Sequence, residues 1–207
     1  MGQYYRAIVK KQNRRIDVYN RYIMRSGKKN YMMAKLTEHS WWLNEFVNAV
    51  CLDVYKRKEK NRIAWIGDYA ESYLESIDEK SFNGLNQNQI SRLTHHCWDC
   101  EGKTVMPTEF TLAGLYLINH TKKEYIDCSK YFKHSNMKTK YGDWCMHPLP
   151  LLTCIGNGLG GGDYCSPTDD STNEYVGAWA WNEISIEDKP IEGFTEIDVI
   201  FKEKGWD

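Results

Sequence analysis

A glycine-rich segment between Gly156 and Tyr164 is the most unusual chemical feature of the sequence, with five glycines in seven residues. Glycine permits positive φ angles and lets a ligand approach the backbone closely, and successive exposed N–H groups can cradle an anion. The residues after it predict no helix, as a dinucleotide-binding loop would need, and no Gly-Lys-Ser/Thr ends it as in a Walker loop. We therefore expect either a flexible connector or a ligand-contacting loop, whose contact residues would be Asn157, Gly158, Gly160, Gly161, Gly162 and Tyr164.

Three further side chains could do acid or base chemistry beside this loop. His147 lies just upstream of it, and histidine titrates near neutral pH, so its imidazole is a candidate acid or base. Asp68 follows an apolar segment and a glycine, a common place for a catalytic or metal-binding carboxylate, and Asp163 lies within the loop. A buried, hydrogen-bonded histidine and an Asx turn are the structural alternatives for His147 and Asp68.

Polar turns supply the remaining candidate ligand contacts. The sequence NHTKKE is expected at the tip of a hairpin, where His120, Lys122 and Lys123 could meet a phosphate or face solvent. His39 stands beside Ser40, but neighbours in sequence rarely face each other productively. A helix-capping role is therefore preferred for Ser40, and His39 is kept as a candidate ligand contact.

The sequence His95-His96-Cys97-Trp98-Asp99-Cys100 contains half of a zinc site. Two thiolates in CxxC spacing can share one tetrahedral ion, but a structural site needs two more ligands, and no second CxxC follows. A redox-active pair is the alternative, although no thioredoxin-like pattern surrounds it. We expect no bound metal and no cofactor, and the metal candidates are Cys97, Cys100, His95 and His96.

Composition places the chain among ordinary globular proteins. It has 207 residues, of which 42% are hydrophobic and 27% charged, and this predicts a single domain spanning residues 1–207. No apolar stretch approaches the roughly 20 residues that cross a bilayer, so no membrane association is expected. Seven cysteines, an odd number, without a secretory signal predict free thiols and a cytoplasmic location.

Charge is distributed unevenly along the chain. The first 60 residues carry a net charge of +9, the last 47 carry −9, and the whole chain carries −1. Such opposite ends can pair internally, or the basic part, including Lys10 and Lys11, can present a face to an anionic partner. The nearly neutral total disfavours nucleic acid as the partner, because affinity for a polyanion grows with the number of phosphates neutralised.

The pattern of apolar residues predicts an α+β protein with a largely antiparallel sheet, built from hairpins, and two or three helices. A helix is expected over residues 41–58, capped by Thr37 or Ser40, and a second over residues 88–99. The expected extended segments are residues 4–9, 16–23, 31–36, 62–66, 112–119, 124–128, 149–155, 175–186 and 194–200.

Six short motifs are spread along the chain, namely MGQYY, EHS, WIGDYA, NHTKKE, HPLPLL and GNGLGGGDY. Taken together, they resemble an uncharacterised family of small bacterial and bacteriophage proteins, and the resemblance covers nearly the whole chain. The resemblance implies one structural unit carried by phages and supplies no activity or catalytic residue. The segment around Cys97 and Cys100 lies outside these motifs.

These features support three functional hypotheses. The first is a protein that binds a phosphate-bearing small ligand, nucleotides included, in a pocket bordered by the glycine-rich loop, His147, Asp68 and the Lys122-Lys123 turn. The second is a phage-type interaction module that inhibits a host protein through exposed Trp and Tyr side chains. The third is a hydrolase that uses His147 with Asp68 or Asp163.

Overall fold

The computed structural model of the chain describes residues 2–12, 15–22, 29–30, 35–37, 41–73, 84–139, 142–165 and 174–201. His39 and most of the extended segment expected over residues 31–36 lie outside these ranges. Among the described residues, no helix is both long enough and apolar enough to span a bilayer.

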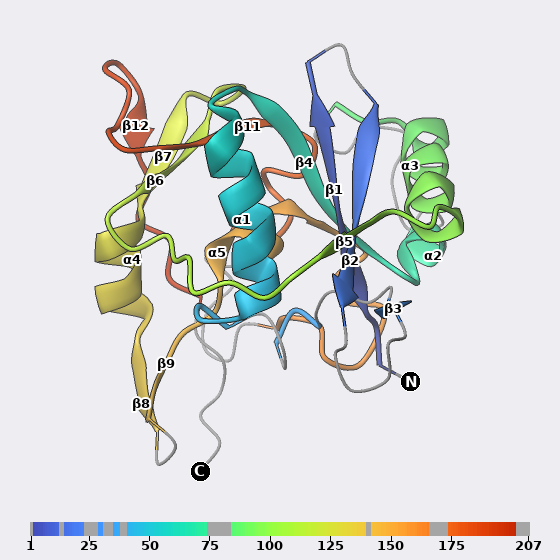
Figure 1. The fold of residues 1–207 in the computed structure, drawn as a ribbon, viewed down its shortest axis with the longest axis horizontal. Helices are drawn as coiled ribbons and strands as arrows, with labels where there is room; N and C mark the ends of the chain where they lie inside the picture. The colour runs from blue at the N-terminus through green and yellow to red at the C-terminus, as the bar shows by residue number, and fades with distance from the viewer. Residues whose placement is uncertain are drawn as a thin grey trace.

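A ten-stranded sheet forms the centre of the molecule (Figure 1). Its strands follow the order β12-β7-β6-β11-β4-β1-β2-β3, with β10 beside β4 and β5 beside β2. Among the described strands, only the pairs β10–β4, β12–β7 and β2–β5 are parallel, so the α+β class with a largely antiparallel sheet is confirmed. The strands are β1 (Tyr5–Lys11), β2 (Ile16–Tyr22), β3 (Lys29–Asn30), β4 (Asn61–Gly67), β5 (Lys103–Val105), β6 (Tyr116–Asn119), β7 (Glu124–Asp127), β10 (Cys154–Ile155), β11 (Glu183–Glu187) and β12 (Thr195–Glu196).

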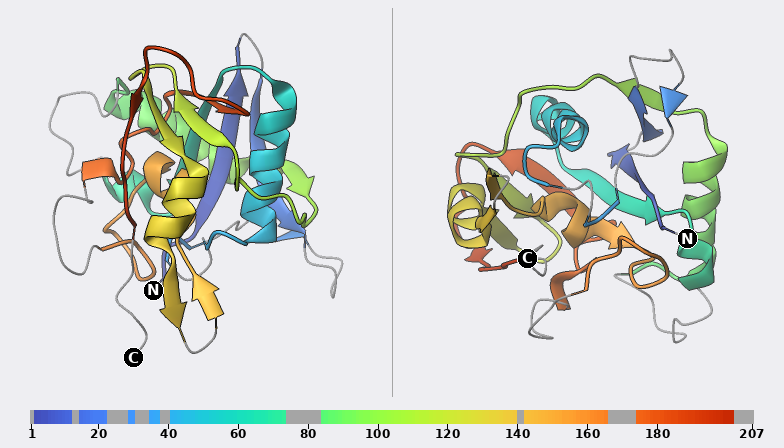
Figure 2. Two further views of the ribbon diagram at one scale, coloured as in Figure 1. Left: turned by 90° about the vertical axis from the view of Figure 1, so that its left-hand side faces the viewer. Right: turned by 90° about the horizontal axis from the view of Figure 1, so that it is seen from below.

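A small second sheet stands apart from this centre. It consists of the hairpin β8 (Met137–Thr139) and β9 (Gly142–Trp144), which projects from the body of the molecule (Figures 1 and 2).

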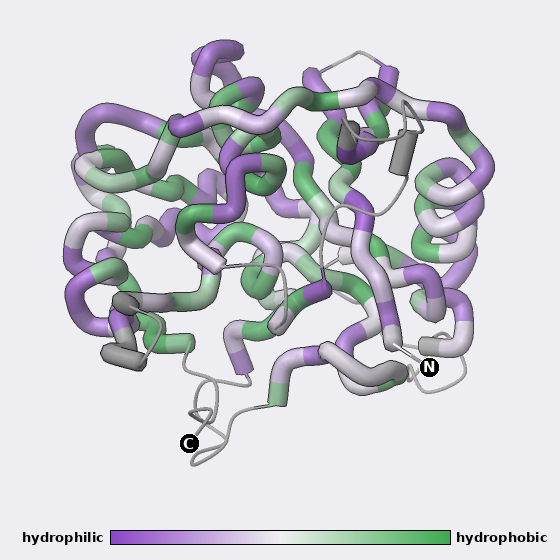
Figure 3. Tube along the Cα trace, turned by 60° about the horizontal axis from the view of Figure 1, so that its bottom comes forward, coloured by the Kyte–Doolittle hydropathy of each residue, from purple (hydrophilic) through white to green (hydrophobic). Residues whose placement is uncertain are grey.

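Successive side chains of β4 alternate between two hydrophobic clusters, one on each face of the sheet. Ile63 and Trp65 face the larger cluster, to which helix α1 (Glu45–Arg57) contributes, whereas Ala64 and Ile66 face the smaller one beneath helix α3 (Gln87–Asp99). Successive side chains of a strand point to opposite faces, so a strand covered on both sides is apolar throughout. Figure 3 shows the complementary pattern on α3, whose hydrophilic residues lie on the side away from the sheet.

The two long helices begin at asparagine caps. The Asn44 side chain accepts hydrogen bonds from the N–H groups of Phe46 and Val47, both at 3.0 Å, and so starts α1 later than the expected residue 41. Asn44, and not Thr37, is the cap of this helix, and Ser40 lies outside the described residues. Asn86 starts α3 with a capping box that includes Gln89.

Three short helices complete the fold, namely α2 (Ala70–Tyr73), α4 (Cys128–Ser135) and α5 (Pro148–Thr153). The prediction of an extended segment over residues 149–155 is wrong for most of its length, because α5 occupies it and only Cys154–Ile155 form a strand. His147 caps this helix and Pro148 fits its first position, where no backbone donor is required. The segment expected over residues 175–186 becomes a strand only at Glu183.

Candidate functional site

The glycine-rich loop holds a carboxylate of its own. Oδ2 of Asp163 accepts hydrogen bonds from the backbone N–H groups of Gly158, Leu159 and Gly160 at 2.7, 2.9 and 3.0 Å. Oδ1 of Asp163 accepts a further hydrogen bond from the Tyr5 hydroxyl at 2.9 Å. Successive N–H groups thus converge on an anion, as such loops can. The anion is a side chain of the loop itself, so these three donors are already engaged.

Close packing accounts for the glycine content. The Gln3 N–H donates to the Gly161 carbonyl at 2.9 Å, and a Cβ atom at Gly160 would lie 2.7 Å from the Gln3 Cβ. Gly156 has a φ of +102°, and a Cβ there would lie 3.0 Å from the Ala70 Cα. The loop therefore packs tightly against the segment that leads into β1.

Side-chain and backbone contacts close the base of the loop. The Asn157 side chain donates to the Tyr164 carbonyl at 3.0 Å and accepts from the Tyr164 N–H at 2.9 Å. The Gly162 carbonyl accepts from both the N–H and the hydroxyl of Thr37, at 3.1 and 3.0 Å. The predicted contact residues thus lie in one ordered turn.

Asp68 lies at the same end of β4 as this loop. Its Oδ1 accepts a hydrogen bond from the Tyr4 N–H at 3.0 Å. Burial raises the pKa of Asp68 above its ordinary value, and the negative charge of Asp163 raises it further, although the Tyr4 hydrogen bond acts in the opposite direction. The structure therefore brings together two of the predicted groups, Asp68 and the glycine-rich loop.

His147 is fully buried inside the larger hydrophobic cluster. Its Nδ1 accepts from the Leu149 N–H at 3.2 Å, and its Nε2 lies 3.2 Å from the Asn48 Oδ1, so Nε2 carries the proton. Its ring lies 5.8 Å from that of Trp42, and burial lowers its pKa to about 3. The imidazole is thus neutral and structural, and neither solvent nor a substrate reaches it.

The turn that contains Lys122 and Lys123, called here the lysine turn, lies at the opposite end of β4. The His120 N–H donates to the Glu183 carbonyl at 2.8 Å, and Glu183 pairs with Arg62 at the start of β4. The glycine-rich loop follows β10, which pairs with Trp65 and Ile66 near the other end of β4. A strand rises about 3.3 Å per residue, so the two ends of β4 lie roughly 20 Å apart. The candidates expected around one pocket are therefore divided between two places.

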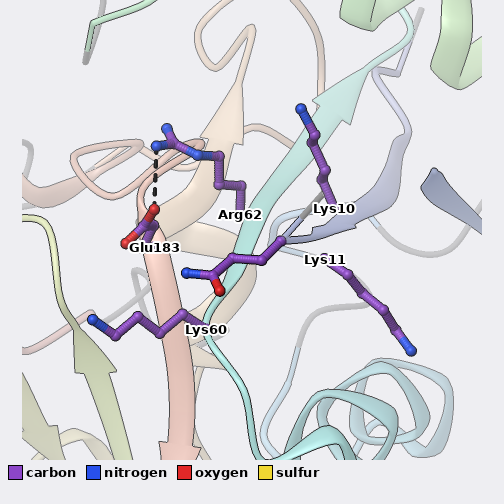
Figure 4. Close-up of a pocket in the computed structure, with 6 residues that line it drawn as sticks. Lys10, Lys11, Lys60, Arg62 and Glu183 are labelled. Carbon is purple, nitrogen blue, oxygen red and sulfur yellow. Dashed lines mark hydrogen bonds and ion pairs between the residues drawn. The ribbon is translucent and has the colours of Figure 1, made fainter. Parts of the chain in front are cut away.

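A basic pocket lies beside the lysine turn, with a volume of about 410 Å³. Lys10, Arg62 and Glu183 are side by side on β1, β4 and β11 in the register of the sheet, so their side chains share one face. Figure 4 shows Lys10, Lys60 and Arg62 at the rim of the pocket, with the charged ends of Lys10 and Lys60 pointing in different directions, while Lys11 points away from Lys60 and Arg62. The pocket is lined by Lys10, Lys11, Gln12, Lys60, Arg62 and Glu183.

Positive charge dominates the basic pocket. Glu183 is its one acidic lining residue and forms an ion pair with Arg62 at 3.3 Å. Lys11 lies 3.9 Å from Glu59, whereas no described residue forms an ion pair or hydrogen bond with the ammonium of Lys10 or Lys60. The nearby His120 has its pKa lowered by burial and by the positive charge of Lys60.

Sequence reasoning did not place Lys60 or Arg62 in a binding site. Lys10 and Arg62 are 52 positions apart in the sequence and become neighbours only through the pairing of β1 with β4. The excess of positive charge in the first 60 residues was the one signal that pointed to such a face. His120 was predicted to contact a ligand together with the glycine-rich loop, and the structure places it instead beside Glu183, near Lys60.

The metal candidates separate into two groups. The Cys100 Sγ lies 3.5 Å from the His96 Nδ1, and Cys97 is buried on the same helix. His95 turns instead towards Glu71, at 2.9 Å, and Asp99, at 3.7 Å. In the part of the chain that the structure describes, no three His, Cys, Asp or Glu side chains are grouped as a metal ion would require.

Comparison with known proteins assigns no relative to this fold or this site. No protein family matches the chain, and neither a curated protein nor a solved structure is significantly similar to it. The functional argument therefore depends on the geometry of the described residues.

Proposed function

We propose that the protein binds a phosphate-bearing small ligand in the basic pocket. The observation that carries the proposal is the cationic lining of one pocket, which includes Arg62 and two lysines, Lys10 and Lys60, whose ammonium groups have no described partner. Lys10 and Arg62 lie on adjacent strands, and Lys60 directly precedes β4, so little of their backbone must be ordered when an anion binds. Hydrogen bonds from Lys and Arg to phosphate are charge-assisted and roughly twice as strong as neutral ones.

The lining indicates which part of the ligand is recognised. Its six residues include no aromatic side chain on which a base could stack, and five of them carry hydrogen-bond donors. A volume of about 410 Å³ lies within the range of small-molecule sites, roughly 300–1,000 Å³. Contact with one or more phosphates, and not with a nucleobase, is therefore the proposed mode of binding.

The geometry gives less support to the other two hypotheses. A hydrolase that used His147 would need that imidazole to reach a substrate, and it is fully buried. An interaction module would need exposed aromatic anchors, whereas the large hydrophobic side chains most exposed among the described residues are Leu43 and Met106.

Titration calorimetry tests the proposal with three probes: pyrophosphate, tripolyphosphate and ATP. We expect saturable binding that weakens about tenfold in Lys60→Gln, because one charge-assisted hydrogen bond is worth about 1.5–3 kcal/mol and about 1.4 kcal/mol is tenfold in affinity. Lys133→Gln is the matched control, since it removes the same charge from an exposed position on α4, away from the pocket. Absence of binding by all three probes, or equal weakening in both variants, would contradict the proposal.

A further inference from the structure

A second pocket contains a thiol beside an imidazole. The Cys100 Sγ lies 3.5 Å from the Nδ1 of His96, one helical turn earlier, at the C-terminal end of α3. Cys100 is half-buried and lines a pocket of about 410 Å³ together with Arg15 and Lys103. A small reagent can therefore reach a sulfur atom that also has a hydrogen-bond partner.

The surroundings of His96 indicate where its proton lies. The Nε2 atom is buried and has no hydrogen-bond partner among the described residues. A buried N–H without an acceptor is rarer and more costly than a buried acceptor without a donor, so the neutral ring is expected to carry its proton on Nδ1. That N–H is directed at the Cys100 sulfur, and a hydrogen bond to the charged form of a group favours that form.

A buried guanidinium adds positive charge at the same place. Arg6 is fully buried and donates to the carbonyls of Cys97, Cys100 and Glu101, the last two at 2.8 Å. Free carbonyls at a helix C-terminus carry a partial negative charge that would disfavour a thiolate. Of the charged residues that line the pocket, Arg15 and Lys103 are basic whereas Asp17 and Glu101 are acidic. Cys100 is thus partly exposed beside an imidazole and a guanidinium, as reactive cysteines often are.

The other cysteines provide internal comparisons. Burial raises the pKa of the Cys97 thiol, whose Sγ donates to the Arg6 carbonyl at 3.7 Å, so Cys97 is expected to stay protonated. Cys165 is the more exposed thiol, and no described residue forms a hydrogen bond with its sulfur. The remaining cysteines are buried, namely Cys51, Cys128, Cys145 and Cys154.

We propose that Cys100 is a reactive thiol at which a small disulfide forms a mixed disulfide. Cys100 releases its proton to water, and its thiolate attacks one sulfur of the reagent. The S–S bond of the reagent breaks as the new S–S bond forms, and the leaving thiolate takes up a proton from water. The reagent is the oxidant: its released half is reduced and Cys100 is oxidised. This site is separate from the basic pocket and does not depend on it.

The first test compares two thiols in the unmodified protein. The full chain is incubated with oxidised glutathione at neutral pH, and the modified peptides are quantified over time by mass spectrometry after quenching with acid. We expect Cys100 to react faster than Cys165, although Cys165 is the more exposed. An equal or faster reaction at Cys165 would overturn the proposal, because exposure alone would then determine the rate.

The second test removes the neighbouring imidazole. The imidazole donates the hydrogen bond that favours the thiolate, so His96→Leu should slow the reaction at Cys100 by about threefold or more. The control is His95→Leu, which removes an imidazole with a side chain 62% exposed and directed at Glu71, and which should leave the rate unchanged. Identical rates in both variants would overturn the proposal. If His96→Leu does not fold, the comparison of the reaction rates of Cys100 and Cys165 still tests the proposal.

Discussion

At the scale of the residue, the burial of His147 makes stability depend on pH. Burial lowers its pKa to about 3, whereas an exposed histidine titrates near 6.5. Between these values the unfolded chain binds a proton that the folded chain does not. The stabilisation is therefore present above about pH 6.5 and is lost as the pH falls towards 3. We expect this group alone to lower the free energy of unfolding by about 1–2 kcal/mol between pH 6.5 and 5.

Urea denaturation of the wild type and of His147→Asn at both pH values measures this contribution. Asparagine can still cap α5, but it does not titrate. His120, whose pKa is also lowered by burial, contributes equally to both proteins, so the difference between them isolates His147. The variant should lose less stability on acidification, and an unchanged loss would show that the imidazole is accessible to protons in the folded state.

At the scale of the element, the glycine-rich loop and the basic pocket should be separable. A Cβ at Gly160 would lie 2.7 Å from the Gln3 Cβ and 2.9 Å from the Gln3 nitrogen, and such overpacking costs about 1–3 kcal/mol. We expect Gly160→Ala to lower the melting temperature and to leave the affinity for tripolyphosphate unchanged. Lys60→Gln should lower the affinity for tripolyphosphate and leave the melting temperature unchanged. If the folded Gly160→Ala variant lost affinity, the glycine-rich loop would be part of the binding site, as the sequence predicted.

At the scale of the element, local sequence patterns predicted the strands and helices that bury a single face. Period-2 alternation predicted β2, and three- and four-residue spacing predicted α1, because these elements each bury one face. The segment that forms α5 was misread as extended, since all its side chains are buried and no periodicity remains. The basic pocket was not predicted, because strand register between β1 and β4, and not local sequence, brings its cations together.

At the scale of the whole molecule, the uneven charge forms internal ion pairs and also leaves some cations unpaired around the basic pocket. The acidic C-terminal part pairs with the basic N-terminal part through Lys58 and Asp188, 3.0 Å apart. It also pairs with Arg62, just beyond the basic part, through Glu183. Lys10 and Lys60 are left without such partners in the described part of the chain. With a net charge of −1, the protein as a whole does not attract anions, so attraction to a phosphate must come from the basic pocket.

This distribution predicts how salt affects binding. The Debye length falls from about 10 Å at 0.1 M to about 3 Å at 1 M ionic strength, so the affinity for tripolyphosphate should fall several-fold over that range in the wild type. Lys60→Gln removes one of the responsible charges and should show a shallower dependence on salt, whereas Lys133→Gln should retain the wild-type dependence. Calorimetry across a sodium chloride series measures all three. An affinity that does not respond to salt would mean that neutral donors hold the ligand, and that the cations which define the pocket do not act on it.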